Sequence, residues 1–344
     1  MRWKTAMDPA SPAPRRSARR AALRTLALAF APLIAAAPCA AQEGFPSKPV
    51  RIVVQYAAGG SSDTIARLLG DKLSPRLGQP VLIENRAGAG GIIGTDYVAK
   101  SAPDGYTLLM TVPGPVTANL ALYKKLPYDP RTDLRMVSDI AVARTVLAVN
   151  PSVPAKDFKS LIAAIQAAPN TYAMGSWGPG TQAHQVQVFM DKSYGTRMLH
   201  VPYKGEAPMV TDLVAGQIQM AVGSVATLKP YIAAGKLRAL AVFGPDRAKP
   251  LPELPTFVEQ GFKDEVYTMT APISLMAPAK TPDAVVERLG REVAAAVHDA
   301  ELQRRIEELG AEPVGNAPAQ AAAAYQALLP VVLRTTRATG VTLD

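Results

Sequence analysis

The chain of 344 residues has little of the residue types on which many enzyme and metal sites depend. Its single cysteine, Cys39, excludes a disulfide framework and a cysteine-rich zinc site. Its three histidines, His184, His200 and His298, are not spaced like paired metal ligands. The sequence contains no Gly-x-Ser-x-Gly segment, which would present a nucleophilic serine. These absences disfavour metal, cysteine and serine-hydrolase chemistry.

Acidic residues are fewer than basic ones, 28 against 37, which gives a formal net charge of +9. The excess is concentrated in residues 1–41, where seven basic residues face one acid, Asp8, so that only +3 is left for the rest of the chain. No stretch of the sequence interleaves basic with aromatic residues, as nucleic-acid-binding segments do. The charge therefore does not predict a nucleic-acid partner.

The apolar run near the N-terminus, Leu26–Ala37, is too short to cross a bilayer, because that takes about 20 residues. Arginines precede it and small residues follow, which is typical of a secretory signal peptide. We expect a signal peptide over residues 1–41, exported by the general secretory route rather than the twin-arginine route. A membrane anchor or a cytosolic amphipathic helix is the alternative. Cleavage after Ala41 would also remove Cys39, which suits an oxidising compartment.

Short β-branched or leucine-rich runs alternate with helical patterns in the remaining chain, which predicts an α/β fold with largely parallel sheets. The predicted strands are Val50–Tyr56, Val81–Asn85, Thr107–Val112, Val146–Asn150, Tyr172–Ser176, Met198–Val201, Ile218–Val222, Leu237–Phe243 and Ile273–Ala277. One predicted helix begins with Ser61 or Ser62 as its N-cap, and another begins with Thr281 as the cap before Pro282. A third helix ends before Gly310. So many strands fit two lobes better than one sheet.

The segment from Tyr56 to Asp63, Tyr-Ala-Ala-Gly-Gly-Ser-Ser-Asp, joins the first predicted strand to the first predicted helix. Its glycines let a ligand approach the backbone, and the free N–H groups at a helix start, together with the serine hydroxyls, can bind an anion. The segment has no Gly-Lys-Ser/Thr, so it is not a phosphate-binding P-loop. A carboxylate is the better candidate ligand, and an ordinary capped turn is the structural alternative.

Two further glycine-rich loops have different interpretations. Gly175–Thr181, with His184 one turn later, also follows a strand and opens a helix, and its Trp177 could stack on a planar ligand or simply cover a hinge. Gly88–Gly94 does not match the dinucleotide-binding fingerprint, because Ile93 stands where the third glycine is needed. We interpret this last loop as structural.

A set of short motifs, ordered along almost the whole mature chain, resembles one family. The motifs are Phe45–Val54, Ala58–Asp63, Val81–Gly91, Pro103–Thr107, Leu126–Pro130, Val201–Gly205, Ala234–Val242 and Leu254–Thr256. Each is weak alone, but the ordered set resembles the Bug (TctC-like) substrate-binding proteins of tripartite tricarboxylate transporters.

This resemblance implies a two-lobe type II periplasmic binding protein fold with a ligand cleft between the lobes. Lobe 1 would comprise residues 42–143 and 266–344, and lobe 2 residues 144–265. The protein would capture a small carboxylate and deliver it to a membrane permease, as a monomer without cofactor, metal or catalysis. One alternative is an accessory that presents its ligand to a two-component sensor. Another is a secreted α/β hydrolase, which the lack of a catalytic constellation disfavours.

The resemblance also assigns a carboxylate-binding role to the first loop and cleft roles to residues 112–119 and 175–184. The expected ligand-binding residues are Tyr56, Ala58, Gly59, Gly60, Ser61, Ser62, Asp63, Thr117, Ser176, Trp177, Gly180, Thr181, His184, Tyr203 and Ser224. Two positions depart from the family. Gly223-Ser224 stands where an acid or Asn is frequent, which disfavours an amino-acid ligand. Trp177 stands where a small residue is frequent, which favours an aromatic or otherwise planar carboxylate.

Overall fold

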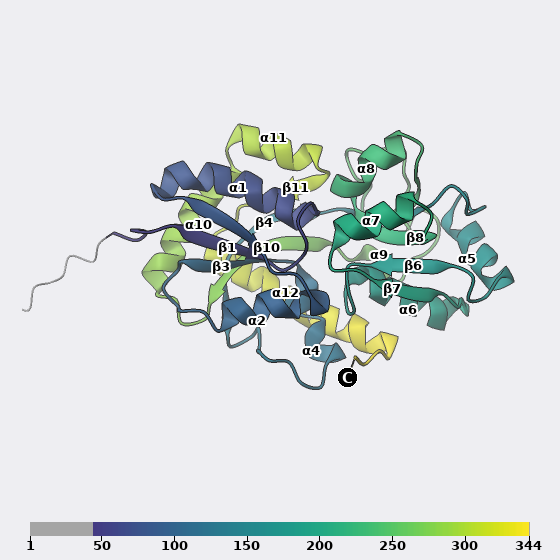
Figure 1. Cartoon of the computed structure of the whole chain (residues 1–344), viewed down its shortest axis with the longest axis horizontal. Coiled ribbons are helices and arrows are strands. Elements are labelled where there is room, and N and C mark those ends of the chain that lie inside the picture. Colours follow the sequence, from purple (N-terminus) through teal and green to yellow (C-terminus); the bar gives the residue numbers. More distant parts are fainter. Residues whose placement is uncertain (1–43, 344) are drawn as a thin grey trace, which may run out of the picture. The chain divides into compact units, whose positions relative to one another are not determined.

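The computed structural model describes residues 44–343, and residues from Pro46 onward form one compact unit (Figure 1). The signal peptide expected over residues 1–41 lies outside the described residues. Within the described part of the chain, no helix has the length and apolar character needed to span a membrane.

The first sheet has six strands in the order β11-β4-β10-β3-β1-β2. They are β1 (Val50–Val54), β2 (Val81–Asn85), β3 (Thr107–Thr111), β4 (Leu134–Ala143), β10 (Ala271–Pro278) and β11 (Ala311–Pro313). β1 runs parallel to β2 and β3, whereas β10 runs antiparallel to both β3 and β4. The C-terminal part of the chain therefore completes the sheet that the N-terminal part begins.

The second sheet has five strands in the order β7-β6-β8-β5-β9. They are β5 (Thr145–Val149), β6 (Ala173–Ser176), β7 (Leu199–Pro202), β8 (Met220–Ser224) and β9 (Arg238–Val242). β6 is parallel to β7 and β8, and β5 is antiparallel to β8 and β9. Both sheets are thus mixed, and the expectation of largely parallel sheets is wrong. The antiparallel pairs arise where the chain crosses between the sheets.

The chain crosses from the first sheet to the second through Arg144 alone, since β4 ends at Ala143 and β5 begins at Thr145. It returns over the longer stretch between β9 and β10. The two-lobe α/β fold is confirmed, with one sheet in each lobe. The lobe boundaries given above, 42–143 with 266–344 and 144–265, stay a prediction.

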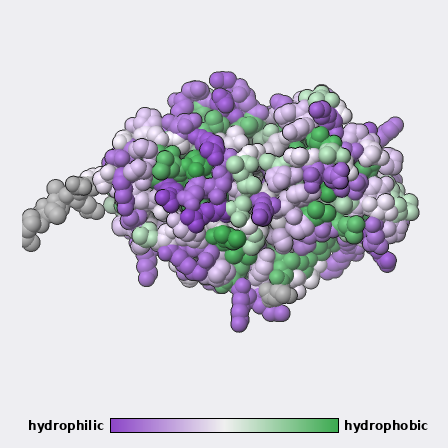
Figure 2. Space-filling view, in the orientation of Figure 1, coloured by the Kyte–Doolittle hydropathy of each residue, from purple (hydrophilic) through white to green (hydrophobic). Residues whose placement is uncertain are grey.

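Helices cover both faces of the first sheet, with α1 and α11 on one side and α2 and α12 on the other (Figure 1). The helices are α1 (Ser61–Leu77), α2 (Ile92–Ala99), α3 (Pro113–Val116), α4 (Asn119–Leu122), α5 (Phe158–Ala167), α6 (Gln182–Tyr194), α7 (Glu206–Val214), α8 (Val225–Ala233), α9 (Glu265–Thr268), α10 (Asp283–Val297), α11 (Ala300–Glu308) and α12 (Pro318–Thr339), with a 3₁₀ turn at Ala89–Gly91. The face seen in Figure 2 carries apolar side chains in small separate groups rather than in one broad patch.

The helix starts differ from their predicted caps. α1 has Gly60 as its N-cap, with no capping side-chain hydrogen bond, so the expected serine cap is wrong. α10 has Pro282 as its N-cap, so Thr281 is not the cap either. One predicted helix end is confirmed. Gly310 follows the C-terminal end of α11 and has φ +73°, a left-handed conformation that favours glycine. The unused side-chain cap at α1 leaves its first N–H groups open to other acceptors.

Candidate functional site

A pocket lies between the two lobes, where loops at the ends of strands in both sheets meet. Its lining residues are Tyr56, Ala57, Gly60, Ser61, Ser62, Asp63, Val112, Pro113, Gly114, Ala118, Ala143, Thr145, Trp177, Thr181, Gln182, Gln185, Glu206, Ser224, Met269, Thr270 and Val332. It encloses about 80 Å³, where one water needs roughly 10–15 Å³ on a comparable measure. This cavity is suited to a small molecule.

The lobe 1 wall is built by the start of α1. Gly59 adopts φ +88°, which favours glycine and turns the chain sharply from β1 into the helix. Ser61 and Ser62 follow at the first helical positions and line the pocket. Since Gly60 supplies no capping side chain, the backbone N–H of Ser61 is available to an acceptor in the pocket.

Asp63 lines the same wall but is engaged within lobe 1. Its carboxylate accepts hydrogen bonds from the Gly59 N–H at 2.9 Å, from Arg67 at 2.9 and 3.1 Å, and from the Asn85 amide at 3.0 Å. Burial alone would raise the pKa of Asp63, but these donors and the Arg67 charge outweigh it and hold the pKa below its ordinary value. Asp63 is therefore a charged residue that braces the loop, with its charge balanced by Arg67.

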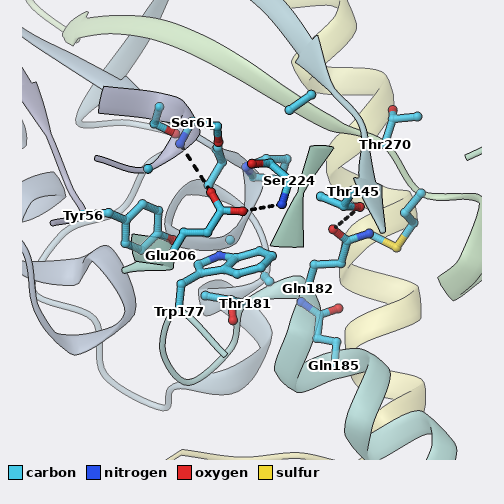
Figure 3. A pocket seen from close by; sticks show the side chains of 18 of the residues that line it. Tyr56, Ser61, Thr145, Trp177, Thr181, Gln182, Gln185, Glu206, Ser224 and Thr270 are labelled. Carbon is cyan, nitrogen blue, oxygen red and sulfur yellow. Dashed lines mark hydrogen bonds between the residues drawn. The ribbon is translucent and has the colours of Figure 1, made fainter. Parts of the chain in front are cut away.

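Glu206, the first residue of α7, places a buried carboxylate across the lobe boundary (Figure 3). Its Oε2 accepts from the Ser61 N–H at 3.3 Å in lobe 1, and its Oε1 accepts a short hydrogen bond from the Ser224 N–H in lobe 2. Sequence reasoning found no acid at the end of β8, where Gly223-Ser224 stands. The inference that this place has no acid is wrong, because the Glu206 carboxylate from another segment bonds to the Ser224 N–H there.

A second backbone contact closes the lobes beside Glu206. The Ala57 N–H donates to the Lys204 carbonyl at 3.1 Å. Gly205 permits this approach, because a Cβ there would lie 2.9 Å from the Ala57 nitrogen. Further from the pocket, the Thr336 hydroxyl of α12 donates to Gln185 of α6 at 3.2 Å. The described structure thus has the two lobes in contact around the pocket.

The side of the pocket away from Glu206 is formed by the start of α6. The Thr145 hydroxyl donates to the Gln182 Oε1 at 3.1 Å, while the buried Gln182 Nε2 has no acceptor within the described residues. Trp177 lies between Glu206 and Gln182 in the view of Figure 3. The pocket therefore has one acidic end and one amide end, with an indole along its wall.

Several polar groups of the loop Gly175–Thr181 form hydrogen bonds within the loop or with neighbouring histidines rather than pointing into the pocket. The Gly180 N–H donates to His184 Nδ1 at 3.1 Å, and the Ser176 hydroxyl lies 2.7 Å from His200 Nε2. The His184 and His200 rings stack with centroids 4.1 Å apart. Burial lowers the pKa of His184, and burial together with the neighbouring His184 lowers the pKa of His200 to about 4. These groups stabilise the loop as neutral side chains.

The structure divides the predicted ligand-binding residues into two groups. Those that line the pocket are Tyr56, Gly60, Ser61, Ser62, Asp63, Trp177, Thr181 and Ser224. Those that do not are Ala58, Gly59, Thr117, Ser176, Gly180, His184 and Tyr203. Several of the second group hold local structure: the Thr117 hydroxyl donates to the Pro113 carbonyl, and the Tyr203 hydroxyl donates to Asp212 at 2.7 Å. Ligand contact stays a prediction for every residue of the set.

Other lining residues are not among the individually predicted ligand-binding residues. They are Ala57, Val112, Pro113, Gly114, Ala118, Ala143, Thr145, Gln182, Gln185, Glu206, Met269, Thr270 and Val332. Ala57, Gln182 and the residues from Val112 to Ala118 fall in loops already assigned to the ligand site or the cleft. Glu206 follows directly after the motif that ends at Gly205. Val332 comes from the C-terminal helix α12, for which the local sequence gives no signal.

The described residues contain no group of three or more His, Cys, Asp or Glu side chains that could hold a metal ion. The fold and the pocket define a two-lobed binding protein. Residues 65–327 match the family described as "Tripartite tricarboxylate transporter family receptor" (TctC). The chain therefore belongs to the TctC family, and the resemblance seen in the sequence is confirmed.

Two curated relatives match over most of their length. One, "UPF0065 protein in tcbD-tcbE intergenic region" from Pseudomonas sp. strain P51, is 38% identical over 280 residues, which are 80% of this chain and 82% of the relative. The other, BugT from Bordetella pertussis strain Tohama I, is 35% identical over 286 residues, which are 83% of this chain and 87% of BugT.

Several solved structures share the fold. Periplasmic binding protein BugD has a TM-score of 0.83 at 31% identity, over 87% of this chain and 100% of BugD. R. palustris Rpa4515 with adipate has a TM-score of 0.82 at 32% identity, over 87% and 99%. MatC from Rhodopseudomonas palustris with bound malate has a TM-score of 0.80 at 29% identity, over 85% and 100%. BugD is described as a periplasmic binding protein.

Proposed function

We propose that this protein is a periplasmic solute-binding protein that captures a small carboxylate between its lobes and delivers it to a tripartite tricarboxylate-type membrane transporter. Binding would occur without chemistry, in a monomer, after export with removal of residues 1–41. The observation that carries the proposal is the small pocket lined by both lobes, because a ligand there gains contacts that exist only when the lobes are closed.

Relatives support the carboxylate part of this proposal. Rpa4515 and MatC were solved with adipate and malate, which are small carboxylates. The lobe 1 wall of this chain carries the hydroxyls of Ser61 and Ser62 and the N–H groups of a helix start, which are donors suited to a carboxylate. One of these groups, the Ser61 N–H, is bonded to Glu206. Trp177 in the wall favours a ligand with an aromatic or otherwise planar part.

Mass spectrometry of small molecules released from gently purified protein tests this function. We expect a small carboxylic acid, and we expect the same acid to raise the melting temperature of the ligand-free protein. A ligand at about 100 times its dissociation constant stabilises the native state by about 2.7 kcal/mol. The proposal fails if no acid is released and none in a panel of mono-, di- and tricarboxylates shifts the melting temperature.

Gene deletion separates transport from sensing. Deletion should abolish uptake of the released acid while leaving its induction of gene expression intact. Lost induction with intact uptake would instead support a role as a ligand-presenting accessory to a two-component sensor.

A further inference from the structure

Glu206 is the charged group of the pocket that has no ionic partner. The lining residues include two acids, Asp63 and Glu206, and no Lys, Arg or His. Asp63 is paired with Arg67, whereas no ion pair involves Glu206 within the described residues. The Glu206 side chain is nevertheless buried, with 8% of the residue exposed. A buried charge is costly unless it is stabilised, so its surroundings need an explanation.

Two backbone N–H groups stabilise this carboxylate, and a glycine makes room for it. The donors belong to Ser61 in lobe 1 and Ser224 in lobe 2. A Cβ at Gly223 would lie 3.2 Å from Glu206 Oε1, which is closer than an ordinary van der Waals contact. Glu206 therefore already occupies one backbone donor from each lobe at this end of the pocket.

Glu206 changes what a ligand meets at this end. A ligand carboxylate that used these two donors would have to displace Glu206, and a ligand carboxylate anywhere at this end would lie beside its negative charge in a buried site. A ligand ammonium or hydroxyl group would instead find carboxylate oxygens with unused lone pairs, since only two of about four acceptor positions are taken. The charge of Glu206 favours the ammonium group most.

We propose that Glu206 makes this end of the pocket a subsite for a positively charged hydrogen-bond donor, so that the ligand is a monocarboxylate that carries an ammonium group at its other end. This inference rests on the proposed function, since it keeps one ligand carboxylate. It reverses the sequence-based argument against an amino-bearing ligand, which depended on the absence of an acid at Gly223-Ser224.

The amide end of the pocket complements this assignment. The Gln182 Nε2 is buried without an acceptor, and it lies away from Glu206 with Trp177 between them in Figure 3. A ligand carboxylate at that end would satisfy the unpaired donor, and the middle of the ligand would pass along the indole. The pocket therefore has a polarity that a symmetric dicarboxylate cannot match.

Calorimetric titration with matched ligands tests the proposal. The six-carbon series is 6-aminohexanoate, 6-hydroxyhexanoate, hexanoate and adipate, and the planar series is 4-(aminomethyl)benzoate, benzoate and terephthalate. Within each series the carboxylate and the spacing are kept while the group at the other end changes. We expect the amine to bind roughly tenfold or more tightly than the dicarboxylate in the native protein, because a charge-assisted hydrogen bond replaces a like-charge contact.

The decisive variant is Glu206→Gln, which keeps the size of the side chain and removes its charge. We expect its preference for the amine over the dicarboxylate to fall by about 100-fold, with amine affinity falling and dicarboxylate affinity rising. The control is Glu287→Gln, the same change at an exposed position of α10 outside the pocket, which should leave the preference unchanged. A general folding defect would weaken all ligands together and would not reverse their order.

The outcomes separate the two proposals. If dicarboxylates bind the native protein best, or if Glu206→Gln leaves the preference unchanged, the subsite assignment is wrong while carboxylate capture stands. Tight dicarboxylate binding would mean that Glu206 joins the lobes only in the protein without ligand and moves away when the ligand binds. If no acid of either series binds either protein, the carboxylate function fails, and the subsite fails with it.

Discussion

The loop before α1 and the loop before α6 look alike in sequence but differ in what they present to the pocket. Both follow a strand, both contain glycine and hydroxyl residues, and both open a helix. In the first loop, Ser61 directs its backbone N–H to Glu206 across the lobe boundary. In the second, His184 accepts from Gly180, and Ser176 bonds to His200.

The difference shows that composition identifies loops at a ligand site without identifying the groups that face the ligand. In the second loop, several side chains bond within the loop and stabilise its conformation. Trp177, Thr181 and Gln182 line the pocket. In the first loop, the Ser61 N–H has no partner within the loop, and Glu206 from a distant segment accepts its hydrogen bond. Four predictions break or sharpen this comparison.

The largest expected effect is on the stability of the second loop. Gly180→Ala should lower the free energy of unfolding by about 2–4 kcal/mol, because Gly180 has φ +78° and a Cβ would lie 2.5 Å from Leu122 Cδ1. The matched change Gly59→Ala, at φ +88° but 3.4 Å from Ala207 Cβ, should cost about 1–2 kcal/mol. Urea denaturation measures both, and equal losses would remove the distinction between the loops.

The next effect is on ligand binding at the first loop. Ser61→Phe should weaken every ligand by about 100-fold, because an aromatic ring overfills a small cavity at a cost of about 3 kcal/mol. The melting temperature should stay close to that of the native protein, since Ser61 is only half-buried at the start of a helix. Ser152→Phe, at an exposed position outside the pocket, is the control for calorimetry. Unchanged affinity in Ser61→Phe would refute the loop assignment.

A smaller and more selective effect is expected at Trp177. Trp177→Ala should lower the affinity for planar ligands by roughly tenfold, because an aromatic contact adds about 0.5–1.5 kcal/mol to the area it buries. Aliphatic acids of similar size should lose less. Calorimetry with benzoate and hexanoate derivatives compares the two, and an equal loss for both classes would show that the indole only fills space.

The smallest effect is a pH dependence that differs between the loops. The folded pKa of His200, about 4, lies below its ordinary value of 6.5, so the unfolded chain takes up a proton first as the pH falls. The free energy of unfolding should therefore decrease by about 1–2 kcal/mol between pH 6.5 and 4. His184, whose pKa burial also lowers, contributes in the same direction.

Asp63 in the first loop responds in another pH window. Because its pKa is lowered, its stabilising contribution is complete above the unfolded value of 3.8 and is lost only as the pH falls below it. Chemical denaturation across pH 3–7 measures both windows. His200→Gln should flatten the slope between pH 6.5 and 4 and leave the acid limb unchanged, whereas an unaltered slope would contradict the assignment to His200.

Local patterns in the sequence predicted most of the strands but not two in the first sheet. β4 was missed because Ser138 and Asp139 interrupt its apolar run. Both are buried and are held by residues far away in the chain: Ser274 donates to Asp139 at 2.6 Å, and the Ser138 hydroxyl donates to the Asn316 carbonyl at 2.8 Å. β11 is only three residues long. Tertiary partners decided these strands, and a local pattern cannot contain them.

The candidate site was likewise predicted only where local sequence patterns carry the signal. The turn before α1 and Trp177 were found because glycine, hydroxyl and aromatic residues in a strand-to-helix loop leave a local signature. Glu206 and Val332 were not, because their places depend on how α7 and α12 meet loops that are distant in the sequence. Whether an acid is present in the pocket is thus a question of long-range packing.

Arg144 has a consequence for how the two halves of the molecule can separate. As the sole residue between β4 and β5, it gives a tether of one residue, which spans at most about 3.6 Å. Its carbonyl accepts from the Val225 N–H, and its guanidinium pairs with Glu312 at 2.7 Å. The halves cannot draw apart at this edge. Opening of the lobes must therefore be a rotation with Arg144 near the hinge axis. The separation between the lobes would be largest on the side farthest from Arg144.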